Sequence, residues 1–154
     1  MRNKQKGFSL IELLIVVAII LIIAAIAIPN LIKSKMAANE ASAVGSLRTI
    51  TTAQIAYSSA CPTLGFAATL TELNTSTTCQ GGTNQIDSTL AGGTKSGYKF
   101  PVAITTTGTP ATTFSETASP VSASSGTRYF FVNETGVIRY NQSATATVND
   151  NALQ

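Results

Sequence analysis

An apolar stretch near the N-terminus constrains the fold of this 154-residue chain more than any other feature. Residues 8–28 contain 19 hydrophobic residues out of 21, and the sixteen residues 13–28 are all uncharged and apolar. A helix of this length extends about 30 Å, which matches the hydrocarbon thickness of a bilayer. A secretory signal peptide would have a shorter apolar region followed by a small-residue cleavage site. The stretch therefore predicts a membrane-spanning helix.

Basic residues on either side of the apolar stretch bear on its orientation. Arg2, Lys4 and Lys6 precede it, and positive charges are usually retained on the cytoplasmic side of a membrane helix. We therefore expect the N-terminus in the cytoplasm and the long C-terminal part outside. Lys33 and Lys35 lie just beyond the stretch and weaken this charge asymmetry.

Glu12 is the one acidic residue inside the apolar stretch. A bare carboxylate costs up to about 2.5–3.5 kcal/mol in the middle of a membrane on insertion scales, and less near the interface. Acidic residues in this setting usually have a partner. Alternatively, Glu12 lies shallow enough to be hydrated by the lipid headgroups, and its own position leaves both interpretations open.

The remainder of the chain is much less hydrophobic than the apolar stretch. From Pro29 onward only 48 of 126 residues are hydrophobic, which is lean for a domain with a self-sufficient core. The sequence has no histidine, and its two cysteines cannot complete a cysteine-based zinc site. Because the usual general base, a nucleophile motif and clustered acids are all missing from the sequence, we expect no enzyme activity, no metal site and no cofactor.

The residues around Glu12 form a motif. The string KGFSLIE at residues 6–12 places a glycine before an aromatic residue and a glutamate four residues after that aromatic. A short basic leader precedes the string, and an uninterrupted apolar span with Pro29 near its end follows it. In these features the segment of about residues 1–35 resembles the N-terminus of type IV prepilins and of the related pseudopilins of type II secretion.

The resemblance implies a processing pathway. In that family a membrane-embedded prepilin peptidase cleaves after the glycine and methylates the new N-terminal amine. In this chain the cleavage would fall between Gly7 and Phe8, remove the leader of residues 1–7, and place the methyl group on the amine of Phe8. The mature chain would lose three basic residues, so that seven basic residues would balance seven acidic residues.

The resemblance also implies a role for Glu12. In the family this glutamate pairs with the positively charged terminal amine of a neighbouring subunit during filament assembly, which here is the amine of Phe8. A carboxylate and an ammonium group that both leave water gain more together than apart. The implied partners are identical or related pilin subunits, the prepilin peptidase, an assembly platform in the bacterial inner membrane, and inner-membrane lipid before assembly.

The helix is expected to continue beyond the membrane. Pro29 would remove one backbone hydrogen bond and kink the helix, although a simple helix end at this position is the alternative. Cys61-Pro62 would end the helix, because proline disfavours helical backbone in the residue before it. We therefore predict one bent helix over residues 8–60, with an amphipathic continuation at residues 29–60. Its apolar face consists of Met36, Ala43, Leu47, Ile50 and Tyr57.

Residues 61–154 are predicted to form a β-rich head, since 29 of these 94 residues are Ser or Thr. Alternation predicts a strand over residues 98–105, with an edge or bulge at Pro101, and a weak strand over residues 112–119. Residues 128–132 and 137–141 are predicted to form a hairpin around a four-residue loop. The tail of residues 142–154 is expected to be loose. The predicted fold class is α+β, with a long N-terminal helix packed on a small antiparallel sheet of three or four strands, as in pilins.

Cys61 and Cys79 are the only cysteines in the chain. Outside the cytoplasm they should be oxidised, and their disulfide would staple loop 61–79 to the end of the helix. Closing a loop of this length stabilises a fold by about 3 kcal/mol in the chain-entropy model. Two free thiols in an intracellular protein are the alternative.

Two other functions compete with a pilus subunit. A type II secretion pseudopilin would form a periplasmic piston, but its major form typically carries a calcium site that the scattered acids do not support. A DNA-binding minor pilin of competence would need a basic surface with aromatic residues. That surface could comprise Lys95, Lys99, Arg128, Arg139, Tyr98, Tyr129 and Tyr140. Strand alternation more simply places these charges in solvent and the aromatics in the core or against a neighbouring subunit, so nucleic acid is not the expected partner.

The sequence therefore predicts the structural subunit of a type IV pilus filament. The subunit would be inserted once in the bacterial inner membrane, with its N-terminus in the cytoplasm, and then polymerised through its N-terminal helix into an extracellular pilus. Adhesion, motility or DNA uptake would be functions of the whole filament.

Overall fold

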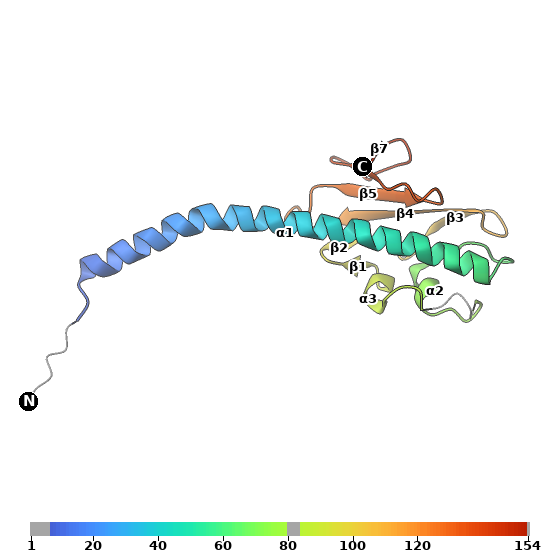
Figure 1. Ribbon diagram of the computed structural model, residues 1–154, viewed down its shortest axis with the longest axis horizontal. Coiled ribbons are helices and arrows are strands. Elements are labelled where there is room, and N and C mark those ends of the chain that lie inside the picture. Colours follow the sequence, from blue (N-terminus) through green and yellow to red (C-terminus); the bar gives the residue numbers. More distant parts are fainter. Residues whose placement is uncertain (1–6, 80–83, 154) are drawn as a thin grey trace, which may run out of the picture. The chain divides into compact units, whose positions relative to one another are not determined.

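The computed structural model describes residues 7–79 and 84–153, and the chain divides into two compact units. The first unit ends at Lys35 and the second begins at Met36. Helix α1, Leu10–Ala60, contributes to both units (Figure 1). The predicted long helix is confirmed, and it begins two residues after Phe8. Pro29 lies inside α1, so a helix end at that position is wrong. The basic leader, residues 1–6, lies outside the described residues.

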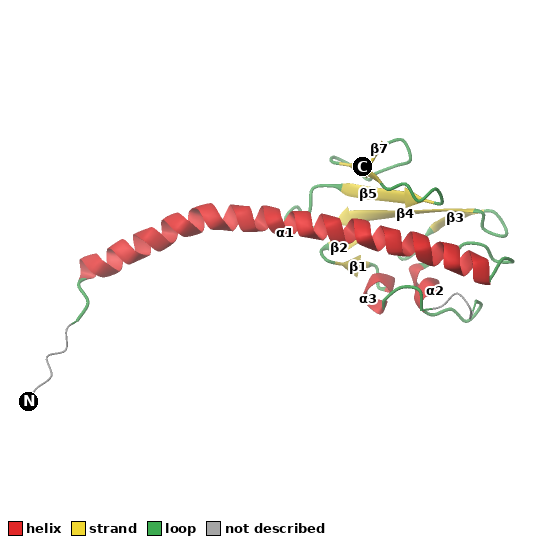
Figure 2. Ribbon diagram, in the orientation of Figure 1, coloured by secondary structure: helices red, strands yellow, loops and turns green. Residues whose placement is uncertain are grey.

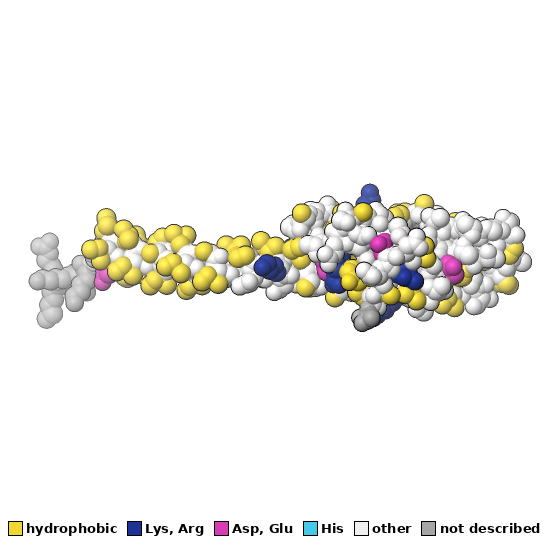
Figure 3. Space-filling model, turned by 90° about the horizontal axis from the view of Figure 1, so that it is seen from above, with side chains coloured by type: hydrophobic (Ala, Val, Ile, Leu, Met, Phe, Trp, Pro, Cys, Tyr) yellow, Lys and Arg dark blue, Asp and Glu magenta, His cyan; other side chains and the backbone are white. Residues whose placement is uncertain are grey.

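The first unit exposes an apolar helical surface. Every large hydrophobic side chain from Phe8 to Ile32 is exposed, over a range of 44–91%. Figure 3 shows hydrophobic side chains covering the visible face of this part of α1. Among the described residues, α1 is the one helix that is long and apolar enough to cross a membrane, and its most apolar 18-residue segment is not buried at all. A surface of this kind is stable only against lipid or a protein partner.

The second unit combines the C-terminal part of α1 with an antiparallel sheet and two short helices (Figure 2). The strands are β1 (Thr94–Lys95), β2 (Tyr98–Lys99), β3 (Thr105–Thr107), β4 (Thr113–Pro120), β5 (Tyr129–Asn133), β6 (Arg139–Asn141) and β7 (Asn151–Ala152). Within the described residues, the strand order is β1-β2-β4-β5-β6-β7, and β3 also pairs with β4. The α+β fold is confirmed, with seven short strands in place of the predicted three or four.

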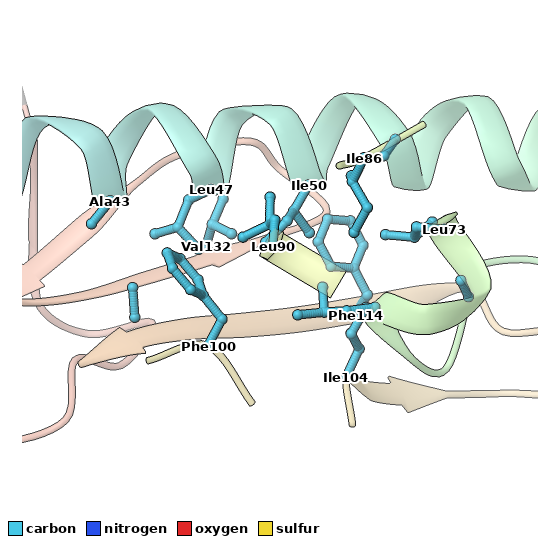
Figure 4. Close-up of a cluster of buried hydrophobic side chains, with 14 of the residues drawn as sticks. Ala43, Leu47, Ile50, Leu73, Ile86, Leu90, Phe100, Ile104, Phe114 and Val132 are labelled. Atoms are coloured by element: carbon cyan, nitrogen blue, oxygen red, sulfur yellow. The ribbon is translucent and has the colours of Figure 1, made fainter. Parts of the chain in front are cut away.

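The core lies between α1 and the sheet. Four residues of the predicted apolar face of α1, namely Ala43, Leu47, Ile50 and Tyr57, are at most 2% exposed. Alternate residues of β4 and β5 are buried against them. Figure 4 shows Leu47 and Ile50 of α1 above Phe114 and Val132 of these strands. Burial of each such side chain contributes about 1.5–3 kcal/mol, so this face holds the helix on the sheet.

The prediction of one strand over residues 98–105 is wrong. The chain pairs as β2 at Tyr98–Lys99 and again as β3 at Thr105–Thr107, but the residues between pair elsewhere. The Phe100 N–H donates to the Gly93 carbonyl at 2.8 Å, and the Ile104 N–H donates to the Ala68 carbonyl at 2.8 Å. Pro101, where an edge or a bulge was expected, lies in this interruption between β2 and β3. The weak strand expected over residues 112–119 is confirmed as β4, the central strand of the sheet.

The C-terminal region is more ordered than the sequence predicted. The expected hairpin exists, but β6 begins at Arg139, so its connection is longer than four residues. The tail is not loose, because β7 pairs with β6 and the Leu153 N–H donates to the Ile138 carbonyl at 2.8 Å. Ala146 is 2% exposed, which ties the intervening loop to the rest of the unit. The sequence shows no strand periodicity here, because β7 has only two residues.

Two short helices were not predicted. Helix α2, Leu70–Asn74, starts with a capping box in which the Thr69 hydroxyl accepts the Glu72 N–H and the Glu72 carboxylate accepts the Thr69 N–H. Helix α3, Ser88–Ala91, starts at Asp87, whose carboxylate accepts the Leu90 N–H at 2.9 Å. The Thr-x-x-Glu pattern at Thr69 indicates the start of a helix. The high Ser and Thr content of residues 61–154 instead favoured the prediction of strands.

The disulfide between Cys61 and Cys79 is confirmed, with a Cα–Cα distance of 5.9 Å. It joins the residue that follows α1 to the end of the segment that carries α2. Cys79 is 1% exposed and belongs to the core, whereas Cys61 lies at its margin. The bond therefore fixes the C-terminal end of the long helix to the head.

Replacing both cysteines by alanine is expected to lower the free energy of unfolding by about 3 kcal/mol, because the unfolded chain regains the entropy of an 18-residue loop. Urea unfolding of the full chain in detergent measures this difference. A reductant should bring the wild-type midpoint down to that of the double variant and leave the double variant unchanged. Equal midpoints for the two oxidised proteins would contradict the stabilising role.

Candidate assembly interface

The start of α1 is capped by its own acidic residue. The Ser9 N–H donates to Glu12 Oε2 at 2.8 Å, and the Ser9 carbonyl accepts the Leu13 N–H at 3.2 Å. Ser9 therefore takes the position before the first helical residue, in the Ser-x-x-Glu pattern of a capping box. Sequence interpretation missed this local role of Glu12, although the pattern was visible. A carboxylate here also interacts favourably with the positive end of the helix dipole.

The residues of the predicted processing site precede the helix. Gly7 and Phe8 lie outside α1, and the Phe8 side chain is 91% exposed. A Cβ atom added at Gly7 would meet no other atom within 4 Å, so the fold itself does not require glycine there. Glu12 lies in the first turn of α1 and is exposed. The predicted pairing between Glu12 and the Phe8 amine of another copy stays a prediction.

The backbone around Pro29 is supported by a neighbouring side chain. Pro29 has no N–H to donate within the helix. Asn30 Nδ2 donates to the Ile26 carbonyl at 3.1 Å, and the Ser34 hydroxyl donates to the Asn30 carbonyl at 3.0 Å. These two bonds supply additional partners to carbonyl groups near the proline. The predicted kink at Pro29 stays a prediction.

Glu40 anchors α1 to the head. Its carboxylate accepts the Arg128 Nε–H at 2.7 Å, the Thr127 N–H at 2.8 Å and the Thr127 hydroxyl at 3.1 Å. The Glu40 side chain is 8% exposed, so the partners replace the water that it loses on folding. Burial works to raise the pKa of Glu40, but the hydrogen bonds from Thr127 and the charge of Arg128 outweigh it and hold the pKa below its usual range.

Two further side chains donate hydrogen bonds to the backbone of the loop before β5. Asn39 Nδ2 donates to the Ser125 carbonyl at 2.9 Å, and the Tyr98 hydroxyl donates to the Arg128 carbonyl at 2.8 Å. A side chain at Gly126 would overlap the Tyr98 ring, so this approach requires glycine. The loop that precedes β5 is thereby fixed between α1 and β2.

The structure does not assemble the basic aromatic surface considered for DNA. Arg128 pairs with Glu40 and lies over the Phe130 and Tyr140 rings at 5.5 and 5.7 Å. The other contacts are Lys95 with Asp87 at 2.8 Å and Arg139 Nη1 with the Asp150 carbonyl at 2.8 Å. Tyr98 is fully buried, while Lys99 is exposed and Tyr129 partly exposed. Most of these side chains therefore serve the fold.

The acidic residues of the head lie apart from one another, and four of them accept backbone hydrogen bonds. Glu72 and Asp87 cap short helices, and Asp150 accepts the Thr147 N–H at 2.7 Å. Glu116 is buried in the sheet, and Glu134 is exposed in a turn. Within residues 7–79 and 84–153, no three His, Cys, Asp or Glu side chains come close enough together to hold a metal ion.

The N-terminal segment matches a known family of sequences. Residues 2–28 match the family described as the prokaryotic N-terminal methylation motif. The chain is 50% identical over 54 residues to the type IV major pilin protein PilA of Myxococcus xanthus, and 62% identical over 40 residues to the type IV wide pilus major component PilA4 of Thermus thermophilus. The N-terminal segment therefore carries a methylation motif, and part of the chain is similar to two type IV pilins.

The similarity is confined to part of each pilin. The aligned segments cover 35% and 26% of this chain, and only 24% and 30% of the two relatives. No solved structure gives a significant match to this chain. The likeness to type IV pilins therefore rests on the N-terminal sequence motif and on these partial alignments.

Proposed function

We propose that this chain is the structural subunit of a type IV pilus. The observation that carries the proposal is the methylation motif at residues 2–28, which includes the start of α1. The apolar side chains of α1 are exposed along its first half. Both pilins to which it is similar are major components of their pili. The head would then form the outer surface of the filament.

The physical basis of assembly is an exchange of partners for the apolar surface of α1. The surface would lie in the inner membrane before assembly, where lipid tails cover residues 8–28. Polymerisation would replace lipid contacts by packing against the same helix of other copies. Glu12 would pair with the Phe8 amine of a neighbour and fix the axial register, since each charge then has a partner in a medium of low dielectric constant.

Cleavage after Gly7 is expected to depend on glycine and to be recognised by a prepilin peptidase. A Gly7→Leu variant should keep its leader, because the peptidase site and not the fold requires a small residue at this position. Intact mass spectrometry of the membrane-extracted protein measures the outcome. The wild type should lack residues 1–7 and carry one additional methyl group.

A Ser9→Ala variant is the matched control, since it changes a neighbouring side chain on the other side of the cleaved bond. It should be processed like the wild type. A wild-type protein that retains Met1 would contradict the proposed processing, and normal cleavage of Gly7→Leu would contradict the role of the glycine.

Electron microscopy of producing cells tests the function. Deletion of the gene should remove surface filaments, and expression of the wild-type chain should restore them. Cells that overproduce the chain and show no long fibres would favour the periplasmic piston of type II secretion, a role that none of the described contacts favours. Retention of DNA by the isolated protein is likewise not expected, because Arg128 and Lys95 are already paired.

A further inference from the structure

Glu116 is a carboxyl group in the core of the head. It lies on β4 between Phe114 and Ala118, on the face of the strand that packs toward α1, and it is 2% exposed. Its cross-strand neighbour on β5 is Val132, which is fully buried. The position is therefore one that a hydrophobic residue usually occupies.

The carboxyl group lies beside an interruption in the sheet. On one side, β5 pairs with β4 continuously from Ser115 to Ala118. On the other side, β3 pairing ends at Ser115 and β2 pairing begins at Ser119. No strand of the described chain therefore pairs with residues 116–118 on that side, because residues 100–104 pair with Gly93 and with the segment before α2.

Glu116 supplies the partner that the missing strand would have supplied. Successive N–H groups along a strand point to opposite sides, so residues an even number of positions apart share a side. The Val121 N–H donates to the Gly97 carbonyl, on the β2 side of β4. Thr117 is four residues earlier, so its N–H points to the same side, into the interruption. Glu116 Oε1 accepts this N–H at 3.2 Å.

The second oxygen of Glu116 has no partner among the residues that the structure describes. Oε2 is buried and makes no hydrogen bond to any described atom. Glu40, the other buried acid, has four hydrogen bonds and an arginine, so the two sites differ in their ability to hold a charge. An ionised carboxylate without a counter-charge is unfavourable in such a site, whereas the neutral acid is tolerated.

No titratable group on the elements around Glu116 compensates a charge there. On α1, Glu40 is paired with Arg128, Arg48 is exposed, and Tyr57 is buried in the core. The amide of Gln54 is occupied by the Ala67 backbone. The hydroxyl of Tyr98 on β2 donates to the Arg128 carbonyl, and the residues of β5 on this face are Phe130 and Val132.

We propose that Glu116 makes the stability of the head sensitive to pH. The side chain is neutral in the folded protein, and its ionisation at alkaline pH weakens the sheet beside the gap between β2 and β3. The proton would leave to solvent, and a bare carboxylate would remain between Phe114 and Ala118. The edges of the sheet that flank residues 116–118 would then open first, because their ladder is already incomplete on this side.

The direction of the pH dependence follows from linkage. Burial raises the pKa of Glu116 from 4.5 to about 8, although the Thr117 hydrogen bond acts in the opposite direction. The folded state therefore holds a proton that the unfolded state has lost between these two pH values. Across that window the unfolding equilibrium constant should rise by about tenfold per pH unit, and the contribution of Glu116 should then stay constant at higher pH.

The experiment compares the wild type with Glu116→Gln and with Glu134→Gln, in which an exposed acid is changed in the same way. Unfolding of the full chain in detergent is followed in urea at about pH 5 and about pH 9. Relative to Glu116→Gln, the wild type should lose at least about 100-fold in its folding equilibrium constant between the two conditions. Glu134→Gln should behave like the wild type. Parallel pH profiles of the wild type and Glu116→Gln would overturn the proposal.

A direct titration keeps the proposal testable if Glu116→Gln does not fold. The chemical shift of the Glu116 carboxyl carbon in the labelled wild-type protein reports its ionisation. The expected midpoint lies above neutral pH, with a loss of hydrogen-exchange protection at the Thr117 amide over the same range. A midpoint near the 4.5 of an ordinary glutamate would overturn the proposal.

Discussion

Glu12→Gln is expected to lower filament formation at least about tenfold while the protein stays in the membrane. Glutamine retains an oxygen that can accept the Ser9 N–H, so the cap of α1 is preserved. It has no charge, however, and cannot pair with the amine of a neighbouring copy. Insertion should be retained, because removing a carboxylate from an apolar span lowers the cost of burial in lipid by up to about 2.5–3.5 kcal/mol.

The measurement is the amount of filament sheared from cells, with the membrane fraction assayed in parallel. Glu12→Gln and Glu12→Ala should both yield at least about tenfold less filament than the wild type, which corresponds to about 1.4 kcal/mol or more in subunit association. Glu12→Asp retains the charge and should keep part of the yield. Normal filaments from Glu12→Gln would show that capping, and not charge pairing, is the role of Glu12.

Glu40→Ala is expected to lower the free energy of unfolding of the head by about 3 kcal/mol. The substitution leaves the Arg128 guanidinium without its counter-charge, and it removes the acceptor of the Thr127 N–H at the start of β5. Urea unfolding of the full chain in detergent measures the loss. Glu134→Ala is the matched control, because this exposed acid has no buried partner and its removal should change stability by less than about 0.5 kcal/mol.

The effect of Glu40 should also depend on pH. Its pKa is lowered in the folded protein, so its contribution is fully present above the pKa of the unfolded chain and is lost as pH falls through the folded value. The stability difference between wild type and Glu40→Ala should therefore shrink in acid. A difference that is the same at neutral and strongly acidic pH would mean that Glu40 contributes through packing alone.

The long helix and the disulfide were predictable because their signals are local. The apolar run, the face formed by Leu47 and Ile50, and the Cys61-Pro62 stop determine α1 within a few residues. The disulfide followed from the presence of only two cysteines. The weak strand β4 was also visible, although its central place in the sheet was not.

The contacts that attach α1 to the head were not predictable, since Glu40 and Arg128 are 88 positions apart. A partial signal existed, because Glu40 lies on the same helical face as Ala43 and Leu47, where an acid needs a partner. The split of the strand over residues 98–105 had a different cause. Alternation grouped Tyr98, Phe100, Val102 and Ile104 on one face, and all of these except Val102 are buried. It cannot show that residues 100–104 pair with the segment before α2.

Intact mass analysis of the subunit in sheared surface filaments tests the central claim most directly. The proposed function predicts that this chain is the main component, that it begins at Phe8, and that it carries one methyl group on its terminal amine. Filaments that lack the chain, or that contain it with Met1 still attached, would contradict the proposal that it is a processed pilus subunit.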